Sequence, residues 1–92
     1  MAVSRDMAIL IVDDYRTMLK IVRGLLHQLG FQNVDEATDG KAAYDLICGK
    51  DYGLVISDWN MQPMTGLDLL KKVRSESRTA KLPFIMVTAE AK

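Results

Sequence analysis

Three aspartates stand at positions where the strands of a parallel sheet would deliver them to the same place. Asp13 and Asp14 directly follow the first short apolar run of the chain, and Asp58 follows a later one. Thr88 closes a further apolar run. Because parallel strands bring their carboxyl ends to one edge of a sheet, where ligands bind in the crevice, we expect three carboxylates and one hydroxyl to converge there.

A cluster of carboxylates destabilises a fold unless something offsets its charge. Two like charges about 4 Å apart repel by roughly 4 kcal/mol at an effective dielectric constant near 20. Mg²⁺ suits such a cluster because it binds carboxylate and carbonyl oxygens and keeps waters that a phosphate oxygen can displace, whereas Ca²⁺ needs more ligands. The alternative is that Asp13 and Asp14 cap a helix and Asp58 caps a turn. That alternative accounts for single aspartates but not for three at one edge.

The elements that would hold this cluster alternate along the chain. Short apolar or β-branched runs predict strands at residues 8–12, 33–37, 54–57 and 84–88, and amphipathic stretches lie between them. This alternation is typical of a parallel sheet with crossover helices. The first run, Ala-Ile-Leu-Ile-Val, has no polar position, as in a central strand that is buried on both faces.

The amphipathic stretches predict three helices. The first spans residues 16–29 and ends at Gly30, the second begins after Asp39 and ends near Gly49, and the third begins after Thr65. Asp and Thr are good N-cap residues, and Gly commonly ends a helix. The apolar faces consist of Met18, Val22, Leu25 and Leu29 in the first helix, Ala42, Ala43, Leu46 and Ile47 in the second, and Leu69, Leu70 and Val73 in the third.

The composition fits one small domain. Its 92 residues leave room for a single hydrophobic core. Twelve basic residues balance twelve acidic ones, so nothing suggests nucleic acid or a membrane as a partner. Cys48 is the only cysteine, which excludes an internal disulfide, and we expect a buried thiol in the second helix. The apolar run at residues 7–12 is too short for a signal peptide core, so we expect a cytoplasmic protein.

Four motifs together resemble the CheY-like response-regulator receiver domain of two-component signalling. They are Ile-Leu-Ile-Val-Asp13-Asp14, Asp39-Gly40, Asp58-Trp59-Asn60-Met61 and Val87-Thr88-Ala89-Glu90. The resemblance implies an α/β fold with a flavodoxin-like, doubly wound parallel sheet. In this chain the sheet would have four strands in the order 2-1-3-4 and three helices.

The resemblance also implies a role for each residue of the acidic cluster. Asp58 would accept a phosphoryl group from a sensor histidine kinase. Mg²⁺ would bind directly to Asp14, Asp58 and the Asn60 carbonyl, and to Asp13 mostly through water. A metal fits this chemistry because it offsets the phosphoryl charge and orients an in-line displacement. Such a protein is a signalling phosphoacceptor that assists its own phosphotransfer and dephosphorylation rather than an enzyme.

Residues around the phosphoacceptor resemble the chemotaxis regulators more than the transcription-factor receivers. Thr88 and Ala89 would contact the phosphoryl group and report its arrival, and Asn60 and Glu90 stand where the family tunes its loss. The implied partners are a chemotaxis-type histidine kinase and a downstream motor or effector protein. Simple packing of Trp59 at the sheet edge and loop solvation of Glu90 are the alternative interpretations.

The chain also departs from the family pattern. Pro63 stands one place later than usual in the loop after Asp58, so we expect altered loop geometry but retained metal binding. The family's fourth helix, fifth strand and fifth helix have no counterpart, and we interpret residues 1–92 as a receiver domain that is incomplete at its C-terminus. The lysine that pairs with the phosphoryl group is missing with them. Lys81 precedes the fourth strand and would lie near the opposite edge, and Lys92 is terminal.

These departures leave a second function open. The fourth strand would be an unpaired edge beside an uncovered apolar face, so we expect a homodimer through that strand or by domain swapping. The alternative to a phosphoacceptor is therefore a receiver-like interaction or oligomerisation module that is not productively phosphorylated.

Two other α/β classes fit the residues less well. A haloacid-dehalogenase-type phosphatase needs Asp-x-Asp after the first strand, and this chain has Tyr15 in place of the second aspartate. A flavodoxin-like cofactor binder needs a hydroxyl- and glycine-rich phosphate loop there, whereas Asp13 and Asp14 would repel phosphate without a metal. His27 has no acid or cysteine at metal-ligand spacing, so we expect it to be a solvated helix residue.

Overall fold

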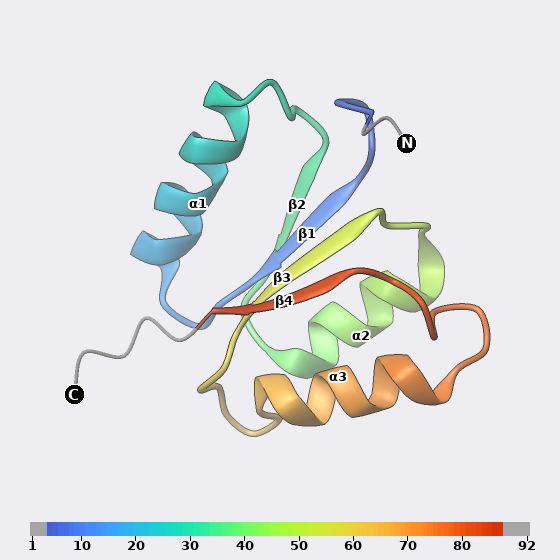
Figure 1. The fold of residues 1–92 in the computed structure, drawn as a ribbon. Helices are drawn as coiled ribbons and strands as arrows, with labels where there is room; N and C mark the ends of the chain where they lie inside the picture. The colour runs from blue at the N-terminus through green and yellow to red at the C-terminus, as the bar shows by residue number, and fades with distance from the viewer. Residues whose placement is uncertain (1–3, 88–92) are drawn as a thin grey trace.

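The computed structural model describes residues 4–87 as one parallel sheet covered by helices on both faces (Figure 1). The strands are β1 (Ile9–Val12), β2 (Val34–Ala37), β3 (Leu54–Asp58) and β4 (Phe84–Val87), and the helices are α1 (Arg16–Gln28), α2 (Gly40–Gly49) and α3 (Gly66–Ser75). The strand order is β2-β1-β3-β4, with every neighbouring pair parallel. The predicted fold class and strand order are therefore confirmed.

The two central strands carry the core. All four residues of β1 are buried, from Ile9 at 0% exposed to Val12 at 2% exposed. Successive side chains of a strand point to opposite faces, so Leu10 and Val12 pack with α2 and α3, whereas Ile9 and Ile11 pack with α1. This two-sided burial is the reason that β1 tolerates no polar residue.

The helix ends follow the capping chemistry of the sequence. The Asp39 side chain accepts a hydrogen bond from the Ala42 N–H at 2.8 Å and begins α2. At the start of α3, Thr65 accepts a hydrogen bond from the Asp68 N–H at 3.1 Å, and the Asp68 carboxylate accepts one from the Thr65 N–H at 3.3 Å. This reciprocal pair is a capping box. Gly30, with φ of 98°, turns the chain away from α1, as predicted.

Two side-chain environments differ from the predictions. Cys48 is exposed rather than buried. The reason is that α2 buries the side that carries Ala43 and Ile47, and the next residue along a helix is turned about 100° away. His27 is half-buried rather than solvated, and its Nε2 atom is covered without a hydrogen-bond partner in the part of the chain that the structure describes.

Candidate functional site

The three predicted aspartates lie together at the carboxyl edge of the sheet. Asp13 and Asp14 follow β1, and Asp58 is the last residue of β3. One carboxylate oxygen from each lies within 4.8 Å of those of the other two. Asp13 and Asp58 are half-buried, and Asp14 is exposed. The cluster is open to solvent on one side, so an ion or a phosphate could reach it.

The environment of Asp13 disfavours the negative charge of its carboxylate. Burial raises the pKa of the Asp13 carboxyl above its ordinary value, and the negative charges of Asp58 and Asp14 raise it further. A hydrogen bond from the Tyr15 N–H, at 2.9 Å, acts in the opposite direction. A divalent cation would relieve the repulsion, and an all-oxygen donor set suits a hard cation such as Mg²⁺.

Helix capping does not account for these aspartates. The N-cap residue of α1 is Tyr15, and no side chain accepts a capping hydrogen bond there. The Asp13 carboxylate instead accepts the N–H of Tyr15, two residues on, as in a local turn. The alternative that Asp13 and Asp14 are simple caps of the first helix is therefore not supported.

The loop after β3 is closely packed against the backbone of the phosphoacceptor candidate. The Gly66 N–H donates to the Trp59 carbonyl oxygen at 3.0 Å, and the Trp59 N–H donates to the Val87 carbonyl oxygen at 3.0 Å. A Cβ atom on Gly66 would collide with the Asp58 carbonyl oxygen and lie 2.7 Å from the Met86 sulfur. Only glycine allows α3 to begin this close to Asp58.

Two of these supporting roles escaped the sequence analysis. Ser57 is fully buried, and its hydroxyl donates to the Asp58 carbonyl oxygen at 3.0 Å. Gly66 directly follows the predicted N-cap residue Thr65, and no sequence pattern indicated its contact with Asp58. A polar residue inside a strand, directly before a candidate nucleophile, is the signal that could have singled out Ser57.

The remaining predicted site residues lie partly within and partly outside the described part of the chain. Asn60 is exposed, two residues after Asp58. Trp59 directly follows Asp58 and is 45% exposed. The Gln62–Pro63 peptide bond is cis. Thr88, Ala89 and Glu90 lie outside the described residues, and so does the end of the fourth strand that was predicted at Thr88.

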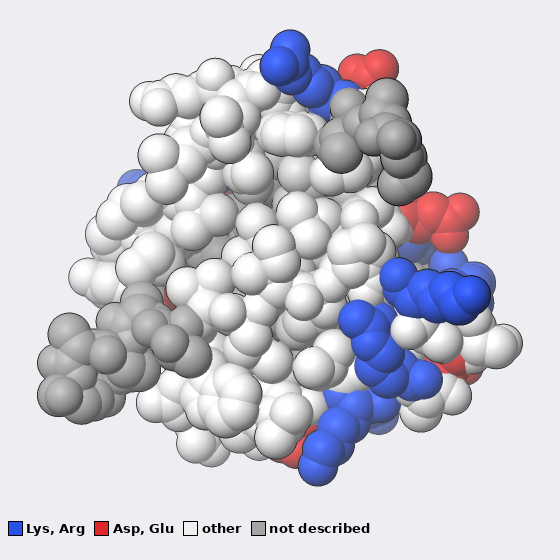
Figure 2. All heavy atoms as spheres, in the orientation of Figure 1, with Lys and Arg blue, Asp and Glu red and all other residues white. Residues whose placement is uncertain are grey.

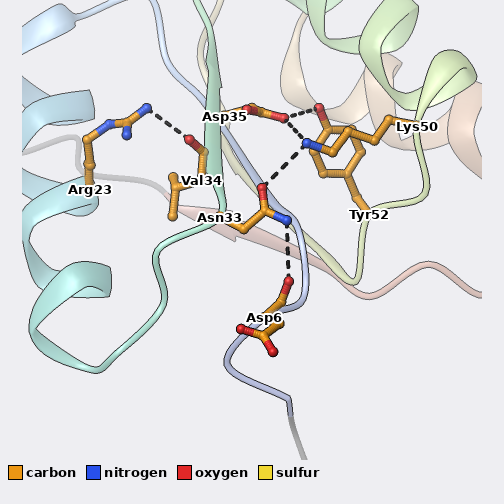
Figure 3. A network of polar contacts seen from close by, with 7 residues as sticks. All are labelled: Asp6, Arg23, Asn33, Val34, Asp35, Lys50 and Tyr52. Carbon is orange, nitrogen blue, oxygen red and sulfur yellow. Dashed lines mark hydrogen bonds and ion pairs between the residues drawn. The ribbon is translucent and has the colours of Figure 1, made fainter.

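Polar residues at the opposite edge of the sheet form a different kind of cluster (Figure 3). The Lys50 ammonium lies 2.9 Å from an Asp35 carboxylate oxygen, and the Tyr52 hydroxyl donates to the same oxygen at 2.7 Å. The hydrogen bonds from Lys50 and Tyr52 hold the pKa of Asp35 below its ordinary value. Opposite charges are paired here, so we interpret this network as structural, in contrast to the three like charges at the carboxyl edge.

Lysines are not part of the acidic cluster in the described chain. Lys81 is exposed and precedes β4, so it lies toward the opposite edge, as predicted. Lys92 lies outside the described residues. In residues 4–87 no helix has the length and apolar character required to cross a membrane.

Comparisons with known proteins agree with this geometry. A family model described as the response regulator receiver domain matches residues 9–92. Chemotaxis protein CheY-3 of Vibrio cholerae is 48% identical over 89 residues, covering 97% of this chain and 68% of that protein. Chemotaxis protein CheY of Pseudomonas aeruginosa is 50% identical over 86 residues, covering 94% and 69% respectively. The solved structure of chemotaxis response regulator CheY4 of Vibrio cholerae superposes with a TM-score of 0.85 at 32% identity, covering 95% of this chain and 72% of that one.

Proposed function

Because this chain belongs to the response regulator receiver family and is similar to CheY chemotaxis proteins, we propose that Asp58 accepts a phosphoryl group from a sensor histidine kinase. The protein is then a signalling phosphoacceptor rather than an enzyme. The observation that carries the proposal is the meeting of three carboxylates within 4.8 Å at the carboxyl edge of the sheet. Folding alone gives no reason to gather three like charges there.

In this proposal, Asp13, Asp14 and Asp58, together with the Asn60 carbonyl, would hold Mg²⁺. When bound, the ion offsets negative charge during phosphoryl transfer. An oxygen of Asp58 forms a bond to phosphorus while the bond between phosphorus and the kinase histidine nitrogen breaks. The chain's contribution is positioning, because Asp58 ends a strand whose preceding residue, Ser57, is fully buried.

The remaining roles follow from the same proposal. Thr88 and Ala89 would contact the phosphoryl group, and Asn60 and Glu90 would tune its hydrolysis. The kinase would be of the chemotaxis type, because CheY-3 and CheY, which are 48% and 50% identical to this chain, are chemotaxis proteins. A motor or effector protein in the cytoplasm would read the signal.

Phosphorylation of the chain by a small acyl phosphate in the presence of Mg²⁺ tests the proposal. We expect the intact mass to gain one phosphoryl group, with a label that is sensitive to hydroxylamine, as an acyl phosphate requires. Asp58→Asn should remove the label, and Asp45→Asn, which changes an exposed carboxylate on α2, should retain it. Retained labelling in Asp58→Asn would exclude Asp58 as the acceptor.

A second measurement separates a receiver from a module that is not phosphorylated. The Trp59 indole is 45% exposed next to Asp58, so its fluorescence should respond to Mg²⁺ and again to the phosphoryl donor. A response to both supports the proposal. Silence to both, in a chain that is folded by circular dichroism, would favour the interaction module instead.

A further inference from the structure

Ser57 places a hydroxyl in the apolar core near the end of β3. Its side chain is fully buried, and its register partners are Val12 of β1 and Met86 of β4. Val55, two residues earlier and therefore on the same face of the sheet, is apolar and also fully buried. A hydroxyl in such surroundings destabilises the fold unless it makes a hydrogen bond. Core packing alone would therefore favour a small apolar residue at this position.

The hydroxyl of Ser57 makes its hydrogen bond to the backbone of the proposed phosphoacceptor. It donates to the Asp58 carbonyl oxygen at 3.0 Å. The N–H of the same peptide unit belongs to Trp59, and it donates to the Val87 carbonyl oxygen at 3.0 Å. Both polar groups of the peptide between Asp58 and Trp59 are thus held, one by a side chain of β3 and the other by β4. These bonds fix the backbone from which the Asp58 side chain extends.

The start of α3 confines the same carbonyl group. A Cβ atom on Gly66 would collide with the Asp58 carbonyl oxygen, so the backbone of α3 lies directly beside it. The Gly66 N–H also donates to the Trp59 carbonyl oxygen at 3.0 Å. Helix α3 therefore limits the movement of the Asp58 carbonyl sterically, whereas the Ser57 hydroxyl orients it through a directional bond.

We propose that Ser57 is a positioning residue for Asp58. By holding the Asp58 carbonyl, its hydroxyl keeps the Asp58 carboxylate in the direction that brings it within 4.8 Å of those of Asp13 and Asp14. Because Ser57 is fully buried, we assign it no contact with the ion or with the phosphoryl group. This inference rests on the proposed function, since it assigns a further role in the same site.

The expected size of the effect follows from what orienting groups do in other metal sites. Loss of a group that orients a metal ligand commonly lowers metal affinity or activity by about 10- to 100-fold. Ser57 acts on the backbone of Asp58 and not on its carboxylate, so we expect an effect at the lower end, about tenfold. An effect of this size is easily separated from that of a stability loss when the variants are compared fully folded.

Thr79 provides a matched control, because it carries the other buried polar side chain among residues 4–87. Its hydroxyl donates to the Val73 carbonyl oxygen at 2.6 Å, so it too is a buried hydroxyl bonded to a backbone carbonyl. Thr79 lies between α3 and β4, in a segment that leads into the amino end of β4, away from Asp58. In Figure 2, Lys and Arg side chains gather over α3 and this segment. Loss of the Thr79 hydroxyl should therefore affect stability but not the acidic cluster.

Three measurements on Ser57→Ala and Thr79→Val test the inference, at a temperature where circular dichroism shows both variants fully folded. In Ser57→Ala we expect the dissociation constant for Mg²⁺, from a titration followed by Trp59 fluorescence, to rise about tenfold. Labelling by a small acyl phosphate at saturating Mg²⁺ should slow by about tenfold. Hydrogen exchange of the Trp59 amide should become faster relative to the amides of β1, since its peptide loses one hydrogen bond. Thr79→Val should match the original chain in all three.

The outcomes separate this inference from the proposed function. Unchanged Mg²⁺ affinity and labelling in Ser57→Ala would overturn the inference and leave the proposed function intact. Equal changes in Thr79→Val would also overturn it, because a buried hydroxyl would then contribute only general stability. If the original chain binds Mg²⁺ but is not labelled, the proposed function fails, and Mg²⁺ affinity and amide exchange in Ser57→Ala still decide the inference. An original chain that binds no Mg²⁺ would overturn both.

Discussion

Asp13 and Asp58 share one edge of the sheet because the residues immediately before them, Val12 and Ser57, are register partners in adjacent parallel strands. This register brings the carboxylate at the end of β1 and the carboxylate at the end of β3 side by side, at positions 45 residues apart in the sequence. The fold thus holds two negative charges close together, and removing or neutralising one of them should change the free energy of unfolding.

We expect Mg²⁺ to stabilise the chain and Asp13→Asn to remove much of that effect. An ion that binds only the folded state at a hundred times its dissociation constant adds about 2.7 kcal/mol to the free energy of unfolding. Without Mg²⁺, Asp13→Asn should be more stable than the original chain by up to about 1 kcal/mol, because the substitution removes a half-buried charge and its solvent-screened repulsion from Asp58 and Asp14. Thermal unfolding with Mg²⁺ and with EDTA measures both effects.

The control for that prediction is Asp45→Asn, which removes an exposed carboxylate paired with Lys41 at 3.3 Å. It should respond to Mg²⁺ like the original chain. If Asp13→Asn is less stable than the original chain in EDTA, the prediction is wrong. The hydrogen bond from the Tyr15 N–H to the Asp13 carboxylate would then stabilise the fold more than the charge repulsion destabilises it.

Acid should weaken the network at the opposite edge of the sheet. The hydrogen bonds from Lys50 and Tyr52 hold the pKa of Asp35 below its ordinary value, so the folded state binds a proton less readily than the unfolded state. The resulting stability is present above the ordinary carboxyl pKa of about 4 and is lost as the pH falls through the lower folded-state pKa. Because the pair is partly exposed, we expect a contribution of no more than about 1 kcal/mol.

Urea unfolding of the original chain and of Asp35→Asn, from neutral pH down to about pH 3, measures this contribution. The variant should be less stable at neutral pH, and the difference between the two chains should shrink in acid. Tyr52→Phe keeps the ring and removes only the hydroxyl donor, so it should lose about 1 kcal/mol. A difference between Asp35→Asn and the original chain that does not change with pH would contradict the assignment.

The sequence predicted the helices and strands better than it predicted the environments of individual side chains. The alternation of apolar runs and caps such as Asp39 located all seven elements to within a few residues, because burial on both faces and capping act locally. The convergence of the three aspartates was also predictable, since parallel strands share an edge. The environment of Cys48 was not, because one residue of rotation about α2 decides its burial. The contact between Gly66 and the Asp58 carbonyl depends on how α3 meets β3, which no local pattern reveals.

Loss of the capping box should destabilise α3 and thereby the loop that follows Asp58. Thr65→Ala removes the acceptor for the Asp68 N–H, and we expect a loss of about 1 kcal/mol in the free energy of unfolding. Thr17→Ala is the control: it makes the same change at an exposed position within α1 and should be neutral or slightly stabilising. Chemical denaturation measures both, and equal losses in the two variants would mean that the cap contributes nothing specific.

Gly66→Ala should lower both the stability of the fold and the phosphorylation of Asp58. The added Cβ would collide with the Asp58 carbonyl oxygen and crowd the Met86 sulfur, and backbone cannot move aside as a flexible side chain can. We expect a loss of about 1–3 kcal/mol in the free energy of unfolding. Because the clash falls on the backbone of Asp58, Mg²⁺ binding and phosphoryl labelling should also weaken.

The matched control is Gly49→Ala, at the end of α2, where an added Cβ meets no atom within 4 Å. Its stability should stay within about 1 kcal/mol of the original chain and its labelling should be unchanged. To separate local displacement from general unfolding, labelling of Gly66→Ala is measured at a temperature where circular dichroism shows it fully folded. Normal labelling of the folded variant would mean that the loop absorbs the methyl group without moving Asp58, and that close packing at Gly66 serves stability alone.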